Sequence, residues 1–550
     1  MISQFLPPAV RYLLIVILTC LVVGSAIYAN VLLRGEFNYD DIDYVVNNTF
    51  IRDMSHFRNV SELRYVGYLT FALNYLYGGL EPRNYHFFNI LIHIANAVVV
   101  YLLASCLIRL TRREEGQEVP AGDWAIPFAA TVVFLTHPLA TQSVSYISQR
   151  FSSLSTLFYL SAVLLYLSGR ERHESGVSVF NLRLVLAFGC ACLGIKTKET
   201  VFTLPAMLTI LEWVFFRTET GTRGKRWLIL LPFYATMLIV PLSLYGPELG
   251  LFETVSGISE RTRGEKLLDL DTRSRTEYLL TQFRVIVTYL RLMVAPYGQR
   301  VIYDYPRYTS ILSVPVILSF LLLAAIAWGG WRCLQSSFRT TGTERVEARL
   351  TGLGILWFFV TISVESSIIP IKDVIFEHRT YLPSFGAYLA MIALISMGVR
   401  RYRPQYKPVA LVLVFLLIGG LLGMATYQRN RVWLNCFAFW DDAVRKEPGL
   451  PIVWQNRAWS YLMVAGIPDE ALQDLNKSIE LAEERYARGT GNSDPADALM
   501  QLAKAYEDRV RVNGTLGNMD AVARDTKKME EYLDELRRLT GLDYQSDLPH

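Results

Sequence analysis

Residues 87–108 read FFNILIHIANAVVVYLLASCLI, an apolar run without a single charged side chain. A helix of about 20 such residues spans the ~30 Å hydrocarbon core of a bilayer. Similar runs recur along the first 426 residues, so we expect a polytopic, all-α membrane bundle with about eleven spans. They lie at about 12–33, 87–108, 124–138, 151–168, 179–195, 201–216, 227–246, 311–331, 351–369, 383–399 and 408–426.

Composition supports two different solvents along the 550-residue chain. Hydrophobic residues make up 52% and charged residues 19%, against about 25% charged in typical soluble proteins. Residues 1–426 are only 16% charged with net charge +9, whereas residues 427–550 are 30% charged with net charge −5. We therefore predict a membrane domain at 1–426 and a water-exposed domain at 427–550. A net charge of +4 without a basic block excludes ordinary nucleic-acid binding.

The basic residues predict the orientation. With a cytoplasmic N-terminus, the cytoplasmic segments carry 19 Lys and Arg residues and the short exported loops carry 5. This bias follows the positive-inside rule and requires an odd number of crossings. It places residues 427–550 outside the cytoplasm, which in a bacterial inner membrane means the periplasm.

Two long exported segments are predicted, at 34–86 and 247–310. The second contains residues 277–297, an apolar stretch interrupted by Arg284 and Arg291. Counting this stretch as a crossing would reverse the charge bias of every later loop. We therefore interpret it as an amphipathic or re-entrant helix in the outer interface.

The region after Trp433 has the pattern of soluble amphipathic helices. Residues 451–484 form a 34-residue unit, PIVWQNRAWSYLMVAGIPDEALQDLNKSIELAEE, with a Gly at the turn between two helices. Its length and residue types resemble a tetratricopeptide repeat, and degenerate units flank it. Such a domain could bind an acceptor protein or peptide, or could brace the membrane part.

The first exported segment opens with an acidic run, Glu36-Phe37-Asn38-Tyr39-Asp40-Asp41-Ile42-Asp43-Tyr44. Adjacent carboxylates repel, which raises a pKa unless a cation or metal compensates. Such a group at a membrane boundary is a candidate general base. The alternative is a solvated acidic loop.

Polar groups also stand at the other exported ends of the apolar runs. The positive-inside rule disfavours Lys and Arg on the exported side. Cations that are nevertheless present there suggest a bound anion such as a lipid phosphate. The alternative is head-group anchoring by long side chains. These residues are His137, Gln149, Arg150, Lys196, Lys198, Glu199, Lys372, Asp373, Glu377, His378, Arg379 and Tyr381.

Several of these stretches together resemble a known family. EFNYDDIDYVVNN and RYVGYLTFALNYLYGGLEPRNYHFFNILIHIANAVVVYLL look like the amino-terminal region of the transmembrane-and-tetratricopeptide-repeat O-mannosyltransferases and their bacterial relatives. HPLATQSVSYISQR, KTKET and EHRTYLPSFG look like later loop motifs of that family, in the same order. With the C-terminal repeat, the resemblance covers nearly the whole chain.

The resemblance implies a GT-C-type glycosyltransferase that uses a polyprenyl-phosphate sugar. It implies Asp40 and Asp41 as the catalytic acidic pair, with Asp41 orienting the acceptor or holding a divalent metal; no other metal site or cofactor is predicted. Since the leaving group is a phosphate, the chemistry needs a base and cations rather than a strong acid. The substrate-binding candidates are Arg64, His137, Arg150, Lys196, Lys198, Glu199, His378, Arg379 and Tyr381.

The predicted function is sugar transfer to a hydroxyl of an exported acceptor, with protein Ser/Thr as the expected acceptor. A lipid or polysaccharide acceptor remains an alternative. A second alternative is a non-catalytic transporter or membrane scaffold that displays the repeat domain. A transporter would more often show a repeat of its span pattern and broken helices. No nucleotide-binding motif of the Gly-rich or P-loop kind is evident, in agreement with a lipid-linked donor.

Overall fold

The computed structural model describes residues 8–58, 63–117, 123–174, 181–216, 223–245, 274–367, 369–371, 373–403, 408–488 and 495–541. Within these ranges the chain is helical and has no strand, which confirms the predicted all-α class. The chain divides into two compact units. Unit 1 contains Met1–Gln299 and Tyr308–Arg431, and unit 2 contains Arg300–Arg307 and Val432–His550.

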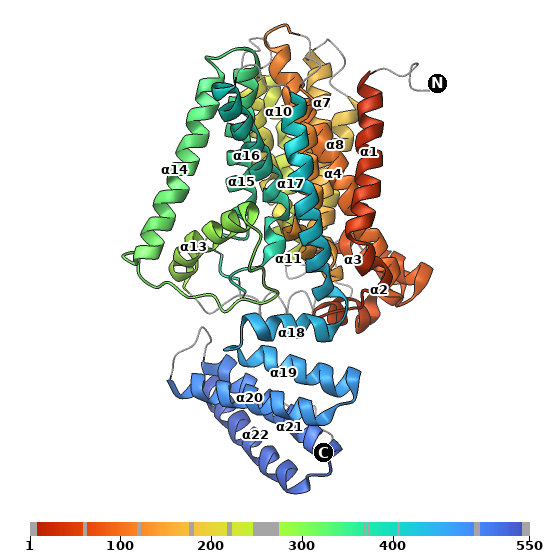
Figure 1. Ribbon diagram of the computed structural model, residues 1–550, viewed down its shortest axis with the longest axis vertical. Coiled ribbons are helices and arrows are strands. Elements are labelled where there is room, and N and C mark those ends of the chain that lie inside the picture. The colour runs from red at the N-terminus through yellow and green to blue at the C-terminus, as the bar shows by residue number, and fades with distance from the viewer. Residues whose placement is uncertain are drawn as a thin grey trace. The chain divides into compact units, whose positions relative to one another are not determined.

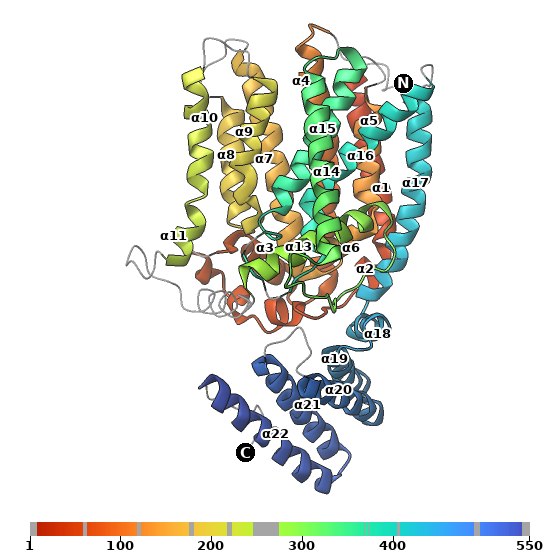
Figure 2. The ribbon, with the colours of Figure 1, turned by 90° about the vertical axis from the view of Figure 1, so that its left-hand side faces the viewer.

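Unit 1 is a bundle of long helices that run roughly parallel to one another (Figures 1 and 2). Its helices are α1 (Pro8–Ile27), α2 (Ala29–Arg34), α3 (Tyr65–Gly78), α4 (Pro82–Arg113), α5 (Ala125–Thr136), α6 (Thr141–Val144), α7 (Arg150–Glu174), α8 (Leu182–Ile195), α9 (Leu204–Phe215), α10 (Arg223–Thr236), α11 (Ile239–Tyr245), α13 (Arg275–Val294), α14 (Val314–Ser337), α15 (Gly342–Ile362), α16 (Tyr381–Tyr402) and α17 (Pro408–Arg429).

Six helices of the described part are long and apolar enough to cross a bilayer, which indicates a multi-pass membrane protein. They are α1, α4, α7, α14, α16 and α17. Only 22% of the apolar window of α14 and 33% of that of α17 is buried inside the protein, as expected for lipid-facing helices. The other five predicted runs coincide with α5, α8, α9, α10–α11 and α15, which are shorter or more charged. Eleven crossings therefore stay a prediction.

Buried polar side chains on α4 connect this helix to its neighbours. Asn89, His93 and Asn96 recur at helical spacing and are completely buried. Asn89 Nδ2 donates to the Val144 carbonyl at 3.1 Å, and Asn96 Nδ2 donates to the Ser153 carbonyl at 2.9 Å. Because lipid offers no hydrogen-bond partners, these contacts hold α4 against the segment 144–153.

Residues 275–294 form the helix α13, where the sequence predicts an amphipathic helix. In both views α13 lies at one end of the bundle and crosses the direction of the long helices (Figures 1 and 2). Its location in the outer interface stays a prediction. The predicted exported segment 247–310 includes α13. Its first part, residues 247–273, lies outside the described residues.

The segment 34–86 is folded over most of its length. After α2 it forms the short helices η2 (Ile42–Val46), η3 (Thr49–Arg52) and η4 (Met54–Arg58), then α3. Aromatic side chains pack this segment onto the start of α7: Phe151 lies in edge contact with Phe71 and Tyr68, at centroid distances of 5.5 and 5.3 Å. The segment that contains the acidic run therefore packs on a small apolar core.

Unit 2 consists of successive helices (Figure 1): α18 (Cys436–Lys446), α19 (Pro451–Ser460), η10 (Tyr461–Ala465), α20 (Pro468–Arg488), α21 (Pro495–Thr515) and α22 (Met519–Thr540). Gly466 has φ +65° at the turn between α19 and α20, where a residue with a side chain would be strained.

Two helix pairs of unit 2 each contain the same kind of Arg–Asp ion pair. In the first pair Arg457 binds Asp474 at 2.7 Å, and in the second pair Arg509 binds Asp525 at 2.6 Å. Each guanidinium also lies over an aromatic ring three residues earlier, on Trp454 or Tyr506. The same combination of an ion pair and a cation–ring contact in both helix pairs supports an internal repeat. The assignment to the tetratricopeptide class stays a prediction.

Candidate functional site

The backbone of the acidic run points its two central carboxylates in different directions. Tyr39 has φ +52°, a left-handed conformation that is uncommon for a residue with a side chain. Directly after it, Asp41 is completely buried whereas Asp40 is partly exposed. Strain of this kind is stored where the surrounding structure requires it, often at functional sites.

Asp41 is bound by backbone amides through both of its carboxylate oxygens. Its Oδ2 accepts from the Asn38 amide at 3.1 Å, and its Oδ1 accepts from the Ser148 amide at 2.6 Å. Burial raises the pKa of Asp41 to about 7, against the lowering effect of these two hydrogen bonds, and the charge of Asp40 raises it further. These contacts fasten the loop to the short helix η6 (Ile147–Gln149), directly before α7. The predicted role of Asp41 in orienting the acceptor stays a prediction.

Asp40 is paired with Tyr146, a buried residue from the segment between α6 and α7. The Asp40 amide donates to the Tyr146 hydroxyl at 3.3 Å, and that hydroxyl is hydrogen-bonded to the Asp40 carboxylate. The rings of Tyr39 and Tyr146 stack at a centroid distance of 6.3 Å. Burial and the nearby carboxylates raise the pKa of Tyr146 well above its usual value, so it remains a donor that orients Asp40.

The segment 148–152, from η6 into the first turn of α7, contacts both the acidic pair and a group of cations. The Ser148 amide donates to Asp41, and four residues later the Ser152 hydroxyl accepts from Lys198 Nζ at 3.0 Å. Between them in sequence, the Phe151 ring lies under the Arg64 guanidinium at 5.6 Å. These five residues thus contact one carboxylate and two cations.

The cations lie around His378. Lys198, Arg379 and Arg64 are all close enough to act electrostatically on the His378 ring. The ring stacks on Phe376 at 5.1 Å, and the His378 amide donates to Gln142 Oε1 at 2.7 Å. Among the described residues, His378 Nδ1 has no hydrogen-bond partner although it is buried. We define Arg64, Lys198, His378 and Arg379 as the cationic cluster.

Two carboxylates pair with residues of the cationic cluster. Lys198 Nζ lies 2.8 Å from Glu365 Oε1, and Arg64 Nε lies 3.6 Å from Glu199 Oε1. The predicted residues Lys198, Glu199, His378, Arg379 and Arg64 are therefore brought together. An incoming phosphate would compete with Glu365 for Lys198.

Arg150 has a structural environment, and its predicted role in binding phosphate stays a prediction. It is completely buried, and its guanidinium donates to Asn89 Oδ1 at 2.6 Å, to Asn74 Oδ1 at 2.5 Å and to the Tyr85 carbonyl at 3.0 Å. It also lies over the Phe71 ring at 4.5 Å. Its fork of donors ties α3 and α4 to the start of α7, which leaves little of it for a ligand.

Replacing Arg150 by Met is therefore expected to destabilise the protein instead of selectively weakening donor binding. Each buried acceptor that loses its donor costs about 1–3 kcal/mol, so we expect a loss of about 3 kcal/mol or more. Thermal unfolding in detergent measures this loss as a lowered Tm. Arg150→Lys should also be destabilised, because an ammonium cannot reproduce the fork. A wild-type Tm together with lost donor binding would contradict this interpretation.

Three further predicted residues lie elsewhere in unit 1. Both ring nitrogens of His137 have backbone partners, the Met293 carbonyl at 3.1 Å and the Leu139 amide at 3.2 Å, so His137 is not a spare donor for phosphate. The Tyr381 hydroxyl bonds to His93 Nδ1 at 2.6 Å between α4 and α16. Lys196 Nζ donates to the Ser243 hydroxyl at 2.8 Å. The predicted polar residue Lys372 lies outside the described residues.

The sequence alone did not identify several residues that support the site. Tyr146 contacts Asp40, and Glu365 contacts Lys198. Each of these two residues is far from its partner in sequence. On α13, Gln282 Nε2 donates to the Val374 carbonyl at 3.0 Å, and the Tyr289 hydroxyl donates to the Phe376 carbonyl at 2.9 Å. The polar residues on one face of α13 were the available signal, but they do not indicate what that face contacts.

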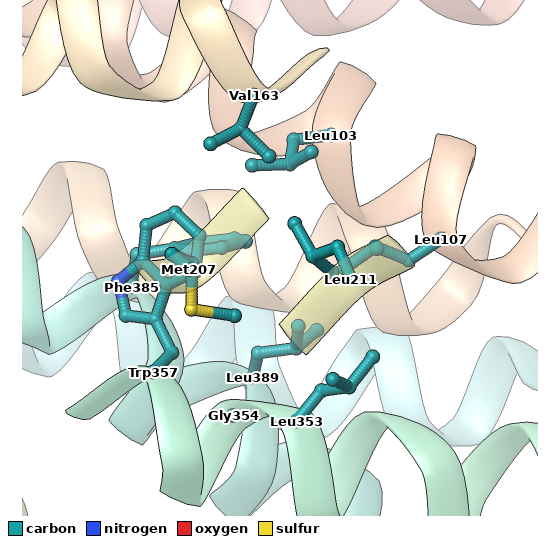
Figure 3. A pocket seen from close by; sticks show the side chains of 10 residues that line it. All are labelled: Leu103, Leu107, Val163, Met207, Leu211, Leu353, Gly354, Trp357, Phe385 and Leu389. Carbon is teal, nitrogen blue, oxygen red and sulfur yellow. The ribbon is translucent and has the colours of Figure 1, made fainter. Parts of the chain in front are cut away.

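The described residues contain no group of three or more His, Cys, Asp or Glu side chains arranged to hold a metal ion. A pocket in the bundle is lined only by apolar groups (Figure 3). Its lining includes no candidate site residue, so we assign it to core packing between α4, α7, α9, α15 and α16. The lining residues are Leu103, Leu107, Val163, Met207, Leu211, Leu353, Gly354, Trp357, Phe385 and Leu389.

Comparison with known proteins finds relatives that are named protein O-mannosyl-transferases. Human "Protein O-mannosyl-transferase TMTC1" is 23% identical over 90% of this chain and 58% of its own length. "Protein O-mannosyl-transferase tmtc2" of Xenopus laevis is 27% identical over 36% of this chain and 24% of its own length, and human TMTC4 is 30% identical over 32% and 27%. The chain thus spans less than two thirds of the length of these relatives.

No protein-family profile matches the chain, and no solved structure matches it. The relatives nevertheless confirm, at low identity, the resemblance found in the sequence motifs: this chain is similar to the TMTC protein O-mannosyltransferases.

Proposed function

We propose that this protein transfers a sugar from a polyprenyl-phosphate donor to a Ser or Thr hydroxyl of an exported protein. The observation that carries the proposal is that the partly exposed Asp40 and the cationic cluster both contact one short segment, residues 146–152, Asp40 through Tyr146 and Lys198 through Ser152. The names of the relatives support protein O-glycosylation, and mannose is the sugar that they suggest.

The reaction requires two functions that these residues can perform. The acceptor oxygen attacks the anomeric carbon while Asp40 takes the hydroxyl proton. The bond between that carbon and the phosphate oxygen breaks, and the lipid phosphate leaves with the electron pair. Lys198, Arg64 and Arg379 stabilise the charge that the departing phosphate gains. No separate strong acid is needed, because the phosphate is already a good leaving group.

The proposal includes a fixed orientation. The 19-to-5 cation bias favours a cytoplasmic N-terminus and places the acidic loop, the cationic cluster and unit 2 on the exported side. In this arrangement residues 1–426 form a GT-C-type catalytic domain in a bacterial inner membrane. Residues 427–550 form a periplasmic repeat domain that binds the acceptor protein. A divalent metal at the acidic pair is not required by this scheme, since Asp41 is engaged by backbone amides.

Reconstitution of the purified full chain tests the function. The protein in lipid vesicles receives radiolabelled polyprenyl-phosphate mannose and an unstructured Ser/Thr-rich peptide. We expect label to appear on the peptide and to be released by base-catalysed elimination, as for a Ser/Thr O-glycoside. Parallel reactions with glucose and galactose donors identify the sugar. Uptake of the intact donor into vesicles without any transfer would instead favour the transporter alternative.

A further inference from the structure

A segment of the loop between α13 and α14 is part of unit 2. Residues Arg300–Arg307 group with Val432–His550, although the residues on both sides of them belong to unit 1. Most of this segment has no regular secondary structure. We call residues 300–307 the strap.

Charged contacts fix the strap to the helices of unit 2. The Glu447 carboxylate, which follows α18, pairs with the Arg300 guanidinium and also accepts from the Asp304 amide at 3.1 Å. The Asp304 carboxylate in turn lies 2.6 Å from Arg485 Nη2 on α20. Glu447 is nearly buried, so removing its partners would leave a desolvated charge.

The residue just before the strap is bound to the other unit. Gln299 is buried, and its Nε2 donates to Glu377 Oε2 at 2.7 Å and to the Pro138 carbonyl at 3.1 Å. Glu377 begins the short helix η8 (Glu377–Thr380), which carries His378 and Arg379 of the cationic cluster. Gln299 therefore fixes the element that presents half of this cluster.

Adjacent Cα atoms across a trans peptide bond are 3.8 Å apart, so Gln299 and Arg300 cannot move independently by more than a small distance. A displacement that moves Arg300 further than rotation about the joining backbone bonds allows must shift Gln299 or break its bonds to Glu377 and Pro138. The polar contacts of α13 with residues 374–376 hold the other side of the same segment.

We propose that the strap couples unit 2 to the cationic cluster, with Gln299 as the positioning residue that transmits the state of the strap to η8. This inference rests on the proposed function, because it treats the cluster as the donor-phosphate site. An acceptor that binds unit 2 more tightly when the strap is bound to Glu447 and Arg485 would favour the donor-binding arrangement of η8. A ligand shifts such an equilibrium only by its differential affinity for the two states.

The Asp304–Arg485 pair provides the test, because both side chains are about one third exposed and tolerate exchange of their charges. We compare Asp304→Arg, Arg485→Asp and the double variant that swaps the two charges. The matched control is the swap of Glu484 and Arg488, an exposed pair on α20 whose side chains bind each other. Hydrogen exchange in the full chain is measured for residues 300–307 and 376–380, together with the KM for polyprenyl-phosphate mannose.

Each single variant should speed exchange in the strap by about two- to fivefold, the effect of breaking a partly exposed ion pair. Exchange at 376–380 and the donor KM should rise with it, and the double swap should restore all three. The Glu484/Arg488 swap should leave residues 376–380 unchanged. Faster exchange in the strap with no change at 376–380 would overturn the proposal, and so would an unchanged strap.

Gln299→Met separates a positioning role from general destabilisation. It should by itself raise exchange at 376–380, and adding Asp304→Arg should then produce no further increase there, because the connection is already lost. Additive effects would contradict transmission through Gln299. If the exchange results hold but the wild-type protein transfers no sugar, the proposed function fails while the coupling stands.

Discussion

Replacement of Asp40 by Asn should lower the rate of sugar transfer by about 10²- to 10⁴-fold, the usual contribution of a general base. Asparagine nearly keeps the shape of the side chain but cannot take the acceptor proton. Donor affinity should change little, because in the proposed mechanism the cationic cluster holds the phosphate. Single-turnover transfer and equilibrium binding of polyprenyl-phosphate mannose measure the two effects separately.

Asp43→Asn is the matched control for this experiment. Asp43 lies on the same loop three residues later and is exposed, and its removal should leave transfer within about twofold. Tyr146→Phe should produce an intermediate loss, since Asp40 would keep its charge but lose the hydroxyl that orients it. Near-wild-type turnover in Asp40→Asn, with unchanged expression, would remove Asp40 as the base.

The helical architecture was predictable because hydropathy acts over whole segments. An apolar run such as 87–108 can be satisfied in lipid only as a helix, whatever its neighbours are. The number of crossings was less accessible, because α8 and α9 are too short to be judged by length alone. Charges interrupt α15 in a similar way, and its buried Glu347 is neutralised by Arg400 on α16, a partner 53 residues away.

The different environments of Asp40 and Asp41 were not predictable from their sequence. They are neighbours with the same side chain, and what buries Asp41 includes an amide 107 residues away, that of Ser148. The structural contacts of Arg150 were not predictable for the same reason. Its position at the exported end of an apolar run suggested a ligand, but its acceptors on α3 and α4 appear only in the folded chain.

Replacement of Lys198 by Gln should weaken binding of the polyprenyl-phosphate sugar by about 10- to 100-fold, since a hydrogen bond to a charged group contributes about 1.5–3 kcal/mol. Lys198 is nearly buried beside Ser152, where solvent screens its charge less than at an exposed site. The loss should appear in donor affinity and in kcat/KM. Equilibrium binding of the labelled donor to the full chain in nanodiscs measures it.

The partner of Lys198 makes this prediction specific. Removing Lys198 leaves Glu365 without its 2.8 Å cation, so Lys198→Gln combines a lost ligand with an unbalanced carboxylate. Glu365→Gln removes only the competing anion and should keep or strengthen donor binding. The double variant should recover the thermal stability of the wild type but not its donor affinity. If Glu365→Gln weakens donor binding as much as Lys198→Gln does, the pair acts as a structural link between the turn after α15 and the residue before η7 (Glu199–Thr203), and the donor phosphate must bind elsewhere.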